Sequence, residues 1–439
     1  MKYDLLLVGF GKAGKTLAVK YANLGKKVAV VEKDSAMYGG TCINIGCIPT
    51  KTLVVSAEKG SSYEQAKERR DAVVAKLNAK NYGMLNNNAN IDVYTAEAKF
   101  VANKVVEIIV DGKKEQLEAE IVVINTGATS VVPKIKGLEE TKNVYSSTEI
   151  QKLEHAPEKL AVLGGGNIGL EFSGLYSKLG SKVTVFNFGE ILQRDEPVVA
   201  QLAKQYMQED GIEFVTTATT KEVKNNGEKV VVVTDEGEFE FDALLYATGR
   251  KPNTENLGLE NTNIVVNERG AVVVDDYCRT NVEGVFAVGD VNGGAQFTYV
   301  SLDDFRIVWN YLQGTGDYNR SKRSNIATSM FITPALSRVG LTEKEAKEQG
   351  YEVLVGELLV ANMPRGAVNG DPRGVYKVVV DKNTKLILGA TLFAKNSEEV
   401  INLIKMAIDN NIPYTYIQNQ VFTHPTMAEN LNDVFNALK

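Results

Sequence analysis

The sequence predicts a repeated α/β fold followed by a C-terminal α+β domain. Two observations support this prediction: a strand, a glycine-rich turn and a helix follow one another near the start of the chain, and the same succession returns near its middle. The last stretch of the chain, beyond residue 320, has mixed strand and helix patterns but no such turn. The length of 439 residues, with 44% hydrophobic and 24% charged residues, allows two or three globular domains.

The first glycine-rich turn follows an apolar strand at the start of the chain. Gly9, Gly11 and Gly14 lead into a predicted helix at residues 15–24, and the next strand ends at Glu32, 18 residues after Gly14. Glycines at this spacing permit a tight turn and a close approach of phosphate groups, the helix N-terminus favours a pyrophosphate, and an acid at this distance binds ribose hydroxyls. This pattern is typical of a Rossmann-like dinucleotide-binding unit.

The second glycine-rich turn has the same spacing but a different residue after its second strand. It contains Gly164, Gly166 and Gly169, and Asn187 takes the place that Glu32 has in the first unit. Two such units in one chain make an incidental glycine turn an inadequate explanation. Each unit continues to an apolar strand that ends in a Thr-Gly pair: Thr126-Gly127 and Thr248-Gly249.

Composition excludes several classes of protein. No apolar run approaches the roughly 18 residues of a membrane span, and the mean hydropathy is -0.15. The start of the chain has no signal-peptide pattern, so we expect a cytoplasmic protein. The net charge of -6 comes from mixed signs, which argues against nucleic-acid binding. Three cysteines and two histidines cannot form a secreted disulfide framework or a histidine-rich metal site, and no metal site is predicted.

A cysteine pair follows the first unit. Cys42 and Cys47 lie in Gly39-Gly40-Thr41-Cys42-Ile43-Asn44-Ile45-Gly46-Cys47-Ile48-Pro49-Thr50-Lys51, where Pro49 suits the first turn of a helix. Cysteines at this spacing can reach disulfide distance, and a thiolate at a helix N-terminus is stabilised. Buried structural cysteines are the alternative, but cytosolic disulfides are usually catalytic. A charged, helix-like stretch follows at residues 56–85.

The cysteine segment, both glycine turns and two further motifs occur together over essentially the whole chain. In this order they resemble the flavin-dependent pyridine nucleotide-disulfide oxidoreductases, whose members include glutathione reductase, dihydrolipoamide dehydrogenase and mercuric reductase. The resemblance implies FAD and NADH or NADPH as cofactors, and a homodimer formed by a C-terminal dimerisation domain. The two further motifs are Val285-Phe286-Ala287-Val288-Gly289-Asp290 and His424-Pro425-Thr426-Met427-Ala428-Glu429.

The resemblance also implies domains. Residues 1–150 and 271–320 would form the FAD-binding domain, residues 151–270 the NAD(P)-binding domain, and residues 321–439 the dimerisation domain. The FAD site would contain Gly9, Gly11, Gly14, Glu32, Thr41, Lys51, Thr126, Gly127, Gly289, Asp290, Gln296, Phe297 and Thr298. The nucleotide site would contain Gly164, Gly166, Gly169 and Asn187, and Ala98 and Gly249 are further candidates for cofactor binding.

Catalytic roles follow from the same resemblance. Cys47 would be the thiol beside the flavin, and Cys42 the interchange thiol that meets the substrate. Two further pairs match the family: Lys51 with Glu171 as an ion pair beside the flavin, and His424 with Glu429 as an acid–base pair inserted into the partner subunit's active site. His155 is expected on the surface, and Cys278 as a packed side chain.

Narrower similarities favour one branch of the family. Three segments are similar in sequence to the branch of the family that defends bacteria against reactive chlorine species: the first glycine turn, Phe297 to Asp304, and Phe422 to Pro425. This branch includes hypothiocyanous acid reductases. We therefore expect reduction of this small oxidant to thiocyanate. The alternatives are reduction of lipoamide or glutathione disulfide, reduction of copper(II), and a flavin-binding thiol redox sensor.

Three departures from the family pattern qualify these expectations. Asn167 stands where many relatives have a tyrosine over the nicotinamide pocket. Asn187 replaces the acid expected for NADH, yet Phe188-Gly189 supplies no arginine for the NADPH phosphate, so the choice between the two nucleotides stays open with a lean to NADH. No cysteine lies near the C-terminus, which argues against the mercuric reductase and large thioredoxin reductase mechanisms.

Overall fold

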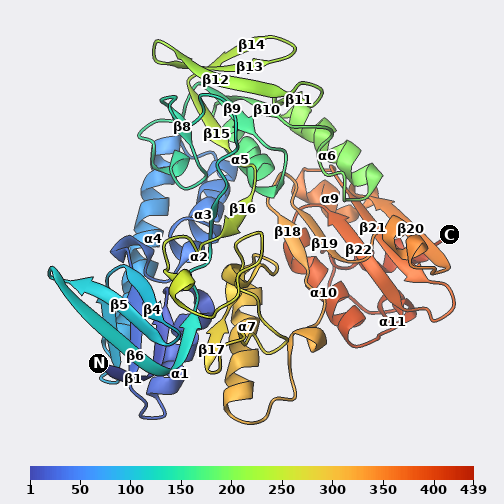
Figure 1. Ribbon diagram of the computed structural model, residues 1–439. Helices are drawn as coiled ribbons and strands as arrows, with labels where there is room; N and C mark the ends of the chain where they lie inside the picture. Colours follow the sequence, from blue (N-terminus) through green and yellow to red (C-terminus); the bar gives the residue numbers. More distant parts are fainter. The chain divides into compact units, whose positions relative to one another are not determined.

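The computed structural model describes residues 1–439, and the chain divides into two compact units (Figure 1). Unit 1 comprises Met1–Val131 and Gly249–Arg323, and unit 2 comprises Val132–Thr248 and Ser324–Lys439. None of the helices combines the length and the apolar character that crossing a bilayer requires.

Unit 1 is built on a seven-stranded sheet with the order β3-β2-β1-β6-β5-β4, in which β17 also pairs with β6. The long strand β6 pairs antiparallel with β5 through its first half and parallel with β1 and β17 through its second half. Because β1 lies between β2 and β6, the sheet has its topological switch point at the carboxyl end of β1. The strands are Lys2–Val8 (β1), Val28–Glu32 (β2), Ile91–Thr95 (β3), Ala98–Ala102 (β4), Val105–Val110 (β5), Lys113–Ile124 (β6) and Val285–Ala287 (β17).

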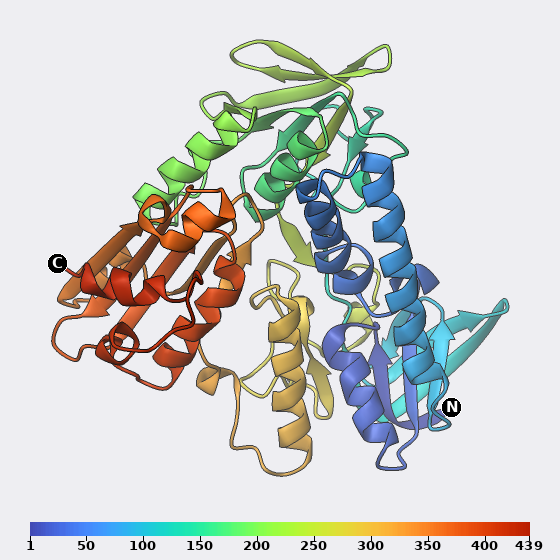
Figure 2. The same ribbon diagram turned by 180° about the vertical axis from the view of Figure 1, so that it is seen from behind.

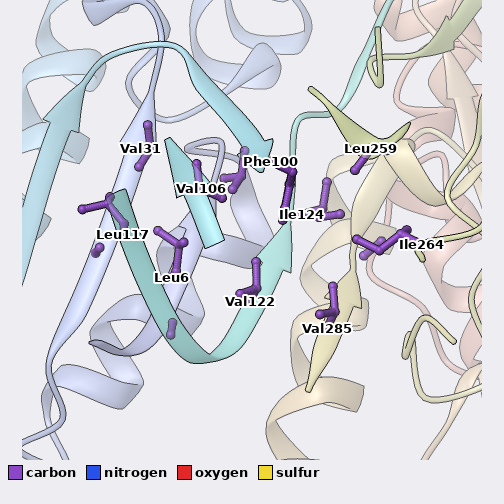
Figure 3. Close-up of a cluster of buried hydrophobic side chains, with 14 of the residues drawn as sticks. Leu6, Val31, Phe100, Val106, Leu117, Val122, Ile124, Leu259, Ile264 and Val285 are labelled. Atoms are coloured by element: carbon purple, nitrogen blue, oxygen red, sulfur yellow. The ribbon is translucent and has the colours of Figure 1, made fainter. Parts of the chain in front are cut away.

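Both faces of this sheet are buried. Successive residues of a strand point to opposite faces, so Leu5 and Leu7 join one apolar cluster while Leu6 and Val8 join the other. Strands β4, β5 and β6 also contribute side chains to the second cluster, and Figure 3 shows Leu6 among Val106, Leu117 and Val122. Apolar residues at every position of a strand are expected where helices or strands cover both faces. The buried strand fixes the position of the glycine turn that follows it.

The helices of unit 1 include both cysteine-bearing segments. The predicted helical stretch at residues 56–85 is two helices: α3 ends at Glu58, and Ser62 begins the next with a capping box to Gln65. The second of these, α4, is the long blue helix in Figure 2. The helices are Lys12–Ala22 (α1), Thr41–Asn44 (α2), Cys47–Glu58 (α3), Tyr63–Asn86 (α4) and Thr298–Leu312 (α7).

Unit 2 begins with a parallel sheet of the order β11-β10-β9-β15-β8, which repeats the arrangement of unit 1 around its second glycine turn. Helix α5 follows this turn, and α6 follows β10. A three-stranded antiparallel sheet, β12-β13-β14, was not anticipated from the sequence. The elements are Val144–Tyr145 (β8), Lys159–Leu163 (β9), Asn167–Lys178 (α5), Lys182–Phe186 (β10), Pro197–Glu209 (α6), Glu213–Val215 (β11), Thr220–Asn226 (β12), Lys229–Thr234 (β13), Glu238–Phe241 (β14) and Ala243–Tyr246 (β15).

The C-terminal part of unit 2 is the expected α+β arrangement. Its five-stranded sheet is antiparallel and has the order β18-β19-β22-β21-β20. The amphipathic helix α10 packs on it through Val400, Ile401 and Ile404. The elements are Thr328–Met330 (β18), Leu336–Gly340 (β19), Glu343–Glu348 (α8), Val353–Leu359 (β20), Pro364–Asn369 (α9), Val375–Asp381 (β21), Ile387–Phe393 (β22), Ser397–Asp409 (α10), Tyr414–Gln418 (α11) and Asn430–Asn436 (α12).

The boundaries of the two units lie beside strands that pair over long distances in the sequence. The chain enters unit 2 at Val132, and β8 pairs with β15 in that unit. It returns to unit 1 at Gly249, and β16 (Arg250–Pro252) pairs antiparallel with β7 (Ala128–Ser130). These long-range pairings have no local sequence signal. The division into three domains stays a prediction.

Candidate active site

The first glycine turn packs tightly against Asn125, the residue that follows β6. Asn125 Oδ1 accepts a hydrogen bond of 2.9 Å from the backbone N–H of Gly14. A Cβ atom at Gly9, where φ is +101°, would lie 2.5 Å from the Asn125 carbonyl oxygen, and one at Gly11 would lie 2.4 Å from Oδ1. Only glycine fits these positions. Helix α1 then begins without a side-chain cap or an acid in its first turn, which suits the pyrophosphate of a dinucleotide.

Both glycine turns donate a backbone N–H to a side chain at the end of the next strand: Glu32 is the last residue of β2, and Asn187 directly follows β10. Phe10 N donates to Glu32 Oε2 at 3.1 Å, and Gly165 N donates to Asn187 Oδ1 at 2.9 Å. Burial raises the pKa of Glu32, against the opposing effect of the backbone hydrogen bonds. Asn187 Nδ2 in turn donates to Gly189 O at 2.8 Å. The second turn therefore reproduces the geometry of the first with a neutral group.

The remaining glycines of the second turn hold α5 close to β9. Gly164 has φ of +110°, and a Cβ atom there would lie 2.7 Å from the carbonyl oxygen of Ala247. A Cβ atom at Gly169 would lie 1.9 Å from the Gly164 carbonyl oxygen. Gly166 is the N-cap of α5 and provides no side-chain hydrogen bond to the helix N-terminus. The backbone at this turn is thus shaped like a phosphate-binding loop.

The two thiols lie at the starts of consecutive helices. Cys42 is the second residue of α2, and Cys47 is the first residue of α3 after the N-cap Gly46. Both are free thiols, and their side chains hydrogen-bond to each other. The hydroxyl of Thr298, the first residue of α7, lies 3.7 Å from Cys47 Sγ. The structure therefore brings Cys42, Cys47 and Thr298 together.

The hydrogen bond between the thiols separates their pKa values. It raises the pKa of Cys42, and burial raises it further. It lowers the pKa of Cys47 to about 6, and the Thr298 hydroxyl and the charge of Lys51 add to this effect against the opposing effect of burial. The titrations belong to the pair, so one thiolate is present at neutral pH, and it lies on Cys47.

A partly buried arginine whose charge acts on Cys47 was missed by the sequence analysis. Arg250, in β16, donates a hydrogen bond to Ala128 O. Burial lowers the pKa of Arg250, while the charges of Asp290 and Cys47 oppose that shift. Burial likewise raises the pKa of Asp290, and the charge of Arg250 opposes it. The only sequence signal for Arg250 was its place directly after the second Thr-Gly pair.

Of the other residues predicted for the cofactor sites, Gly127 lies close to Thr41. A Cβ atom at Gly40 would lie 3.0 Å from Gly11 Cα, and one at Gly127 would lie 3.8 Å from Thr41 Oγ1. Thr126 Oγ1 donates to Asn253 O at 2.7 Å. Further predicted positions are Gly289 and Asp290 in the 3-10 turn Gly289–Asn292, Gln296 and Phe297 before α7, Lys51 on α3, Ala98 at the start of β4, and Gly249 at the start of the second segment of unit 1.

His424 and Glu429 form a pair in unit 2. His424 Nδ1 lies 2.8 Å from Glu429 Oε2, and the histidine side chain is 69% exposed. The backbone N–H of Thr426 donates to Glu429 Oε1 at 3.0 Å. Although burial raises the pKa of Glu429, these hydrogen bonds lower it overall. The carboxylate therefore fixes Nδ1 of an imidazole whose exposed side remains available for proton transfer.

A pocket of about 340 Å³ lies within unit 2 at the start of α5. Asn167, the first residue of α5, lines it. Arg338, which also lines the pocket, pairs with Asp195 at 3.5 Å and with Glu345 at 3.3 Å. Glu171, also on α5, accepts a hydrogen bond of 2.9 Å from Phe331 N. Glu171 and Lys51 belong to different units, and their ion pair stays a prediction.

The last sequence expectations concern single residues and metal binding. His155 is exposed, and Cys278 is fully buried in the apolar cluster beside α1 and α7, as predicted. No group of three or more His, Cys, Asp or Glu side chains has an arrangement suited to a metal ion.

Two dinucleotide-binding turns together with an adjacent thiol pair define a class of protein, the flavoprotein reductases that pass electrons through a dithiol. Comparison with known families agrees. Residues 3–304 match the pyridine nucleotide-disulphide oxidoreductase family, and residues 326–435 match the dimerisation domain of that family. The chain belongs to the pyridine nucleotide-disulphide oxidoreductases, which use FAD and NAD(P)H, and its dimerisation domain indicates a homodimer.

The similar proteins span the whole chain. The probable pyridine nucleotide-disulfide oxidoreductase RclA of Escherichia coli is 44% identical over 439 residues, 100% of both chains. The mercuric reductase of Staphylococcus aureus is 32% identical over 98% of this chain and 81% of its own length. A solved structure of the Cu(II) complex of the HOCl-induced flavoprotein disulfide reductase RclA has a TM-score of 0.98, with 43% identity and 99% of both chains covered.

Proposed function

We propose that this protein is a cytoplasmic NAD(P)H-dependent reductase of hypothiocyanous acid, which it converts to thiocyanate and water. The observation that carries the proposal is the thiol pair, which has one thiolate at neutral pH and a second thiol beside it. Supporting it is the full-length similarity to RclA, a protein described as HOCl-induced. A small oxidant needs only an accessible sulfur, and Cys42, the proposed interchange thiol, is partly exposed.

The geometry of the two glycine turns supports the binding of both cofactors. The turn from Gly9 to Gly14, with Glu32 and Asp290, would hold FAD, and the turn from Gly164 to Gly169, with Asn187, would hold the pyridine nucleotide. FAD, when bound, carries two electrons from the reduced nicotinamide to a disulfide between Cys42 and Cys47. The side chains around the sulfurs then determine which sulfur attacks and where the protons go.

In the first step, Cys42 attacks the sulfur of hypothiocyanous acid. His424 of the partner subunit accepts the Cys42 thiol proton and delivers it to the departing hydroxide, so that water leaves. Glu429 of the partner subunit orients that imidazole through Nδ1, as it does within this chain. The S–O bond of the substrate breaks, and a bond forms between Cys42 and the sulfur of thiocyanate.

In the second step, the Cys47 thiolate attacks Cys42 of this adduct. The disulfide forms, and thiocyanate leaves with the electron pair of the broken S–S bond. Over both steps, one thiol, one thiolate and hypothiocyanous acid give a disulfide, thiocyanate and water. The low pKa of Cys47 suits this role, because the resolving sulfur is already charged.

Two other acceptors have specific support. The relative RclA is described as a Cu(II) complex, which favours copper(II) reduction as the second candidate. Dihydrolipoyl dehydrogenases are 30% identical to this chain, and this similarity favours a conventional disulfide such as lipoamide as another candidate acceptor. A third candidate belongs to a different functional class: a redox sensor that does not turn over a substrate. The pairing of His424 with Glu429 argues against a sensor, because a sensor needs no acid–base pair.

The test is the initial rate of NADH and NADPH oxidation by the FAD-bound protein with each acceptor. The acceptors are hypothiocyanous acid, oxygen, lipoamide, glutathione disulfide and copper(II). We expect rapid turnover with hypothiocyanous acid, reduced in Cys42→Ser to the rate with oxygen alone. Cys278→Ala is the matched control, because it removes a thiol that is 0% exposed. Fast reduction of another acceptor with slow reduction of hypothiocyanous acid would overturn the substrate assignment.

A further inference from the structure

Lys15 is a buried lysine whose ammonium group faces the cysteine segment. It lies on α1 directly after Gly14 and is only 5% exposed. Its Nζ donates hydrogen bonds to Gly39 O at 3.2 Å and to Asn81 Oδ1 at 2.5 Å. Both acceptors are neutral, and burying an ammonium group without an anion is costly. A charged group in this position therefore needs a counter-charge nearby.

Cys42 can supply this counter-charge when it ionises. Lys15 forms no ion pair with a carboxylate, and its only favourable electrostatic interaction with an ionisable group is with Cys42. Burial lowers the pKa of Lys15 to about 8, and the charge of Lys12 lowers it in the same direction. Cys42 lies three residues after Gly39, so the backbone that accepts from Lys15 Nζ leads directly to the sulfur.

Each sulfur of the pair thus has its own lysine. The charge of Lys51 on α3 lowers the pKa of Cys47, whereas the charge of Lys15 lowers that of Cys42. Thr298 on α7 hydrogen-bonds to both. At rest the negative charge lies on Cys47, but attack on a substrate requires negative charge on Cys42. The arrangement supplies an opposite charge for both states.

We propose that Lys15 is a positioning residue for the interchange thiol: its buried ammonium stabilises Cys42 as the thiolate that attacks the substrate. The inference deepens the proposed function and rests on it for the identity of the attacking sulfur. Lys15 need not touch the substrate, since its hydrogen bonds to Gly39 and Asn81 hold it beneath the cysteine segment.

The test measures the reactivity of Cys42 without any natural substrate. In the FAD-bound full chain with Cys47→Ser, the rate of alkylation by iodoacetamide is followed from pH 6 to 10. Lys15→Met is expected to slow alkylation at pH 7 by about tenfold or more and to move the midpoint of the profile upward, because an opposite charge at close range shifts a pKa by roughly 1–3 units. Lys15→Arg keeps the charge and is expected to keep the profile.

Controls separate this role from a structural one. Lys20→Met, an exposed position on the same helix, is expected to leave the profile unchanged. If Lys15→Met does not fold, Asn81→Asp provides the second variant, because a carboxylate there competes for the ammonium and slows alkylation in the same direction. A Lys15→Met or Asn81→Asp profile identical to that of Lys20→Met overturns the inference. A shifted profile in a protein that does not reduce hypothiocyanous acid overturns the proposed substrate alone.

Discussion

Asp304 connects a buried charge cluster to the turn proposed to contact FAD. Its carboxylate, 1% exposed, accepts hydrogen bonds from the backbone N–H of Gly289 at 2.7 Å, from Asn292 Nδ2 at 3.1 Å and from Arg323. The neighbouring Asp303 pairs with the same arginine at 2.6 Å but makes no contact with the turn. The substitution Asp304→Asn therefore tests whether this carboxylate positions the turn that carries Asp290.

The expected magnitude follows from these contacts. Asparagine keeps the size of the side chain but loses the charge and places an amide donor opposite other donors. Hydrogen bonds to charged groups contribute about 1.5–3 kcal/mol each. Weakening two of the three hydrogen bonds to the Asp304 carboxylate therefore lowers the free energy of unfolding by about 3 kcal/mol. The weakened bond to Gly289 adds roughly 1.4 kcal/mol to the free energy of ordering the turn, which corresponds to about tenfold weaker FAD binding.

The assay compares two variants. Urea unfolding of Asp304→Asn and Asp303→Asn is expected to show similar losses of stability, since both aspartates pair with Arg323. Titration of the FAD-free proteins with FAD, followed by flavin fluorescence, is expected to show the loss of affinity only in Asp304→Asn. Equal FAD affinities in the two variants would refute the reasoning, because they would show that the hydrogen bond to Gly289 does not position the turn.

Three further predictions concern other sites. Lys377→Met is expected to lower the free energy of unfolding by about 3–5 kcal/mol, since it leaves Glu196, 2% exposed and 3.0 Å from Lys377 Nζ, without its cation. The reduced protein is expected to gain one thiolate, on Cys47, with a midpoint near pH 6 in the absorbance at 240 nm, because its pKa is lowered to about 6. This lowered pKa stabilises the folded protein fully above the ordinary thiol pKa and loses that contribution as the pH falls through about 6. Asn187→Asp is expected to reduce kcat/KM for NADPH relative to NADH by about tenfold, because a carboxylate there repels the 2′-phosphate.

Each of these has its own control. Lys382 pairs with Glu352 at the surface, so Lys382→Met is expected to change stability by less than about 1 kcal/mol, and an equal loss in both lysine variants would contradict the buried-charge argument. If Cys47→Ser still forms a thiolate with a midpoint near pH 6, the lowered pKa belongs to another sulfur, and the assignment to Cys47 is wrong. An unchanged preference between the two nucleotides in Asn187→Asp would remove this position from the specificity site.

Features with local causes were predictable from the sequence. The turn Gly9–Gly14, the strands around it and the cysteine pair follow from turn chemistry, apolar patterning and spacing, and the structure contains all of them. The helix-like stretch at residues 56–85 was right in type, but its break at the Ser62 cap was missed. Local rules describe such elements because the contacts that determine them are only a few residues apart.

Features that depend on distant contacts were not predictable. Lys15 is spaced like any surface lysine on a helix, and only its packing against Gly39 and Asn81 buries it. Arg250 reaches the neighbourhood of Asp290 because β16 pairs with a strand more than a hundred residues earlier. The unit boundary at Gly249 depends on the same pairing.

The difference between Glu32 and Asn187 has a consequence for how long each ligand stays bound. Both side chains accept a backbone N–H from their glycine turn, but only Glu32 can offer a charged acceptor to a ribose. Charge-assisted hydrogen bonds are roughly twice as strong as neutral ones, so we expect a ribose held by Glu32 to dissociate more slowly than one held by Asn187. A resident flavin has to survive many turnovers, whereas a nucleotide has to depart after each one. On this expectation, the same backbone design, used twice in one chain, would provide a slow and a fast exchange site that differ by a change from carboxylate to amide.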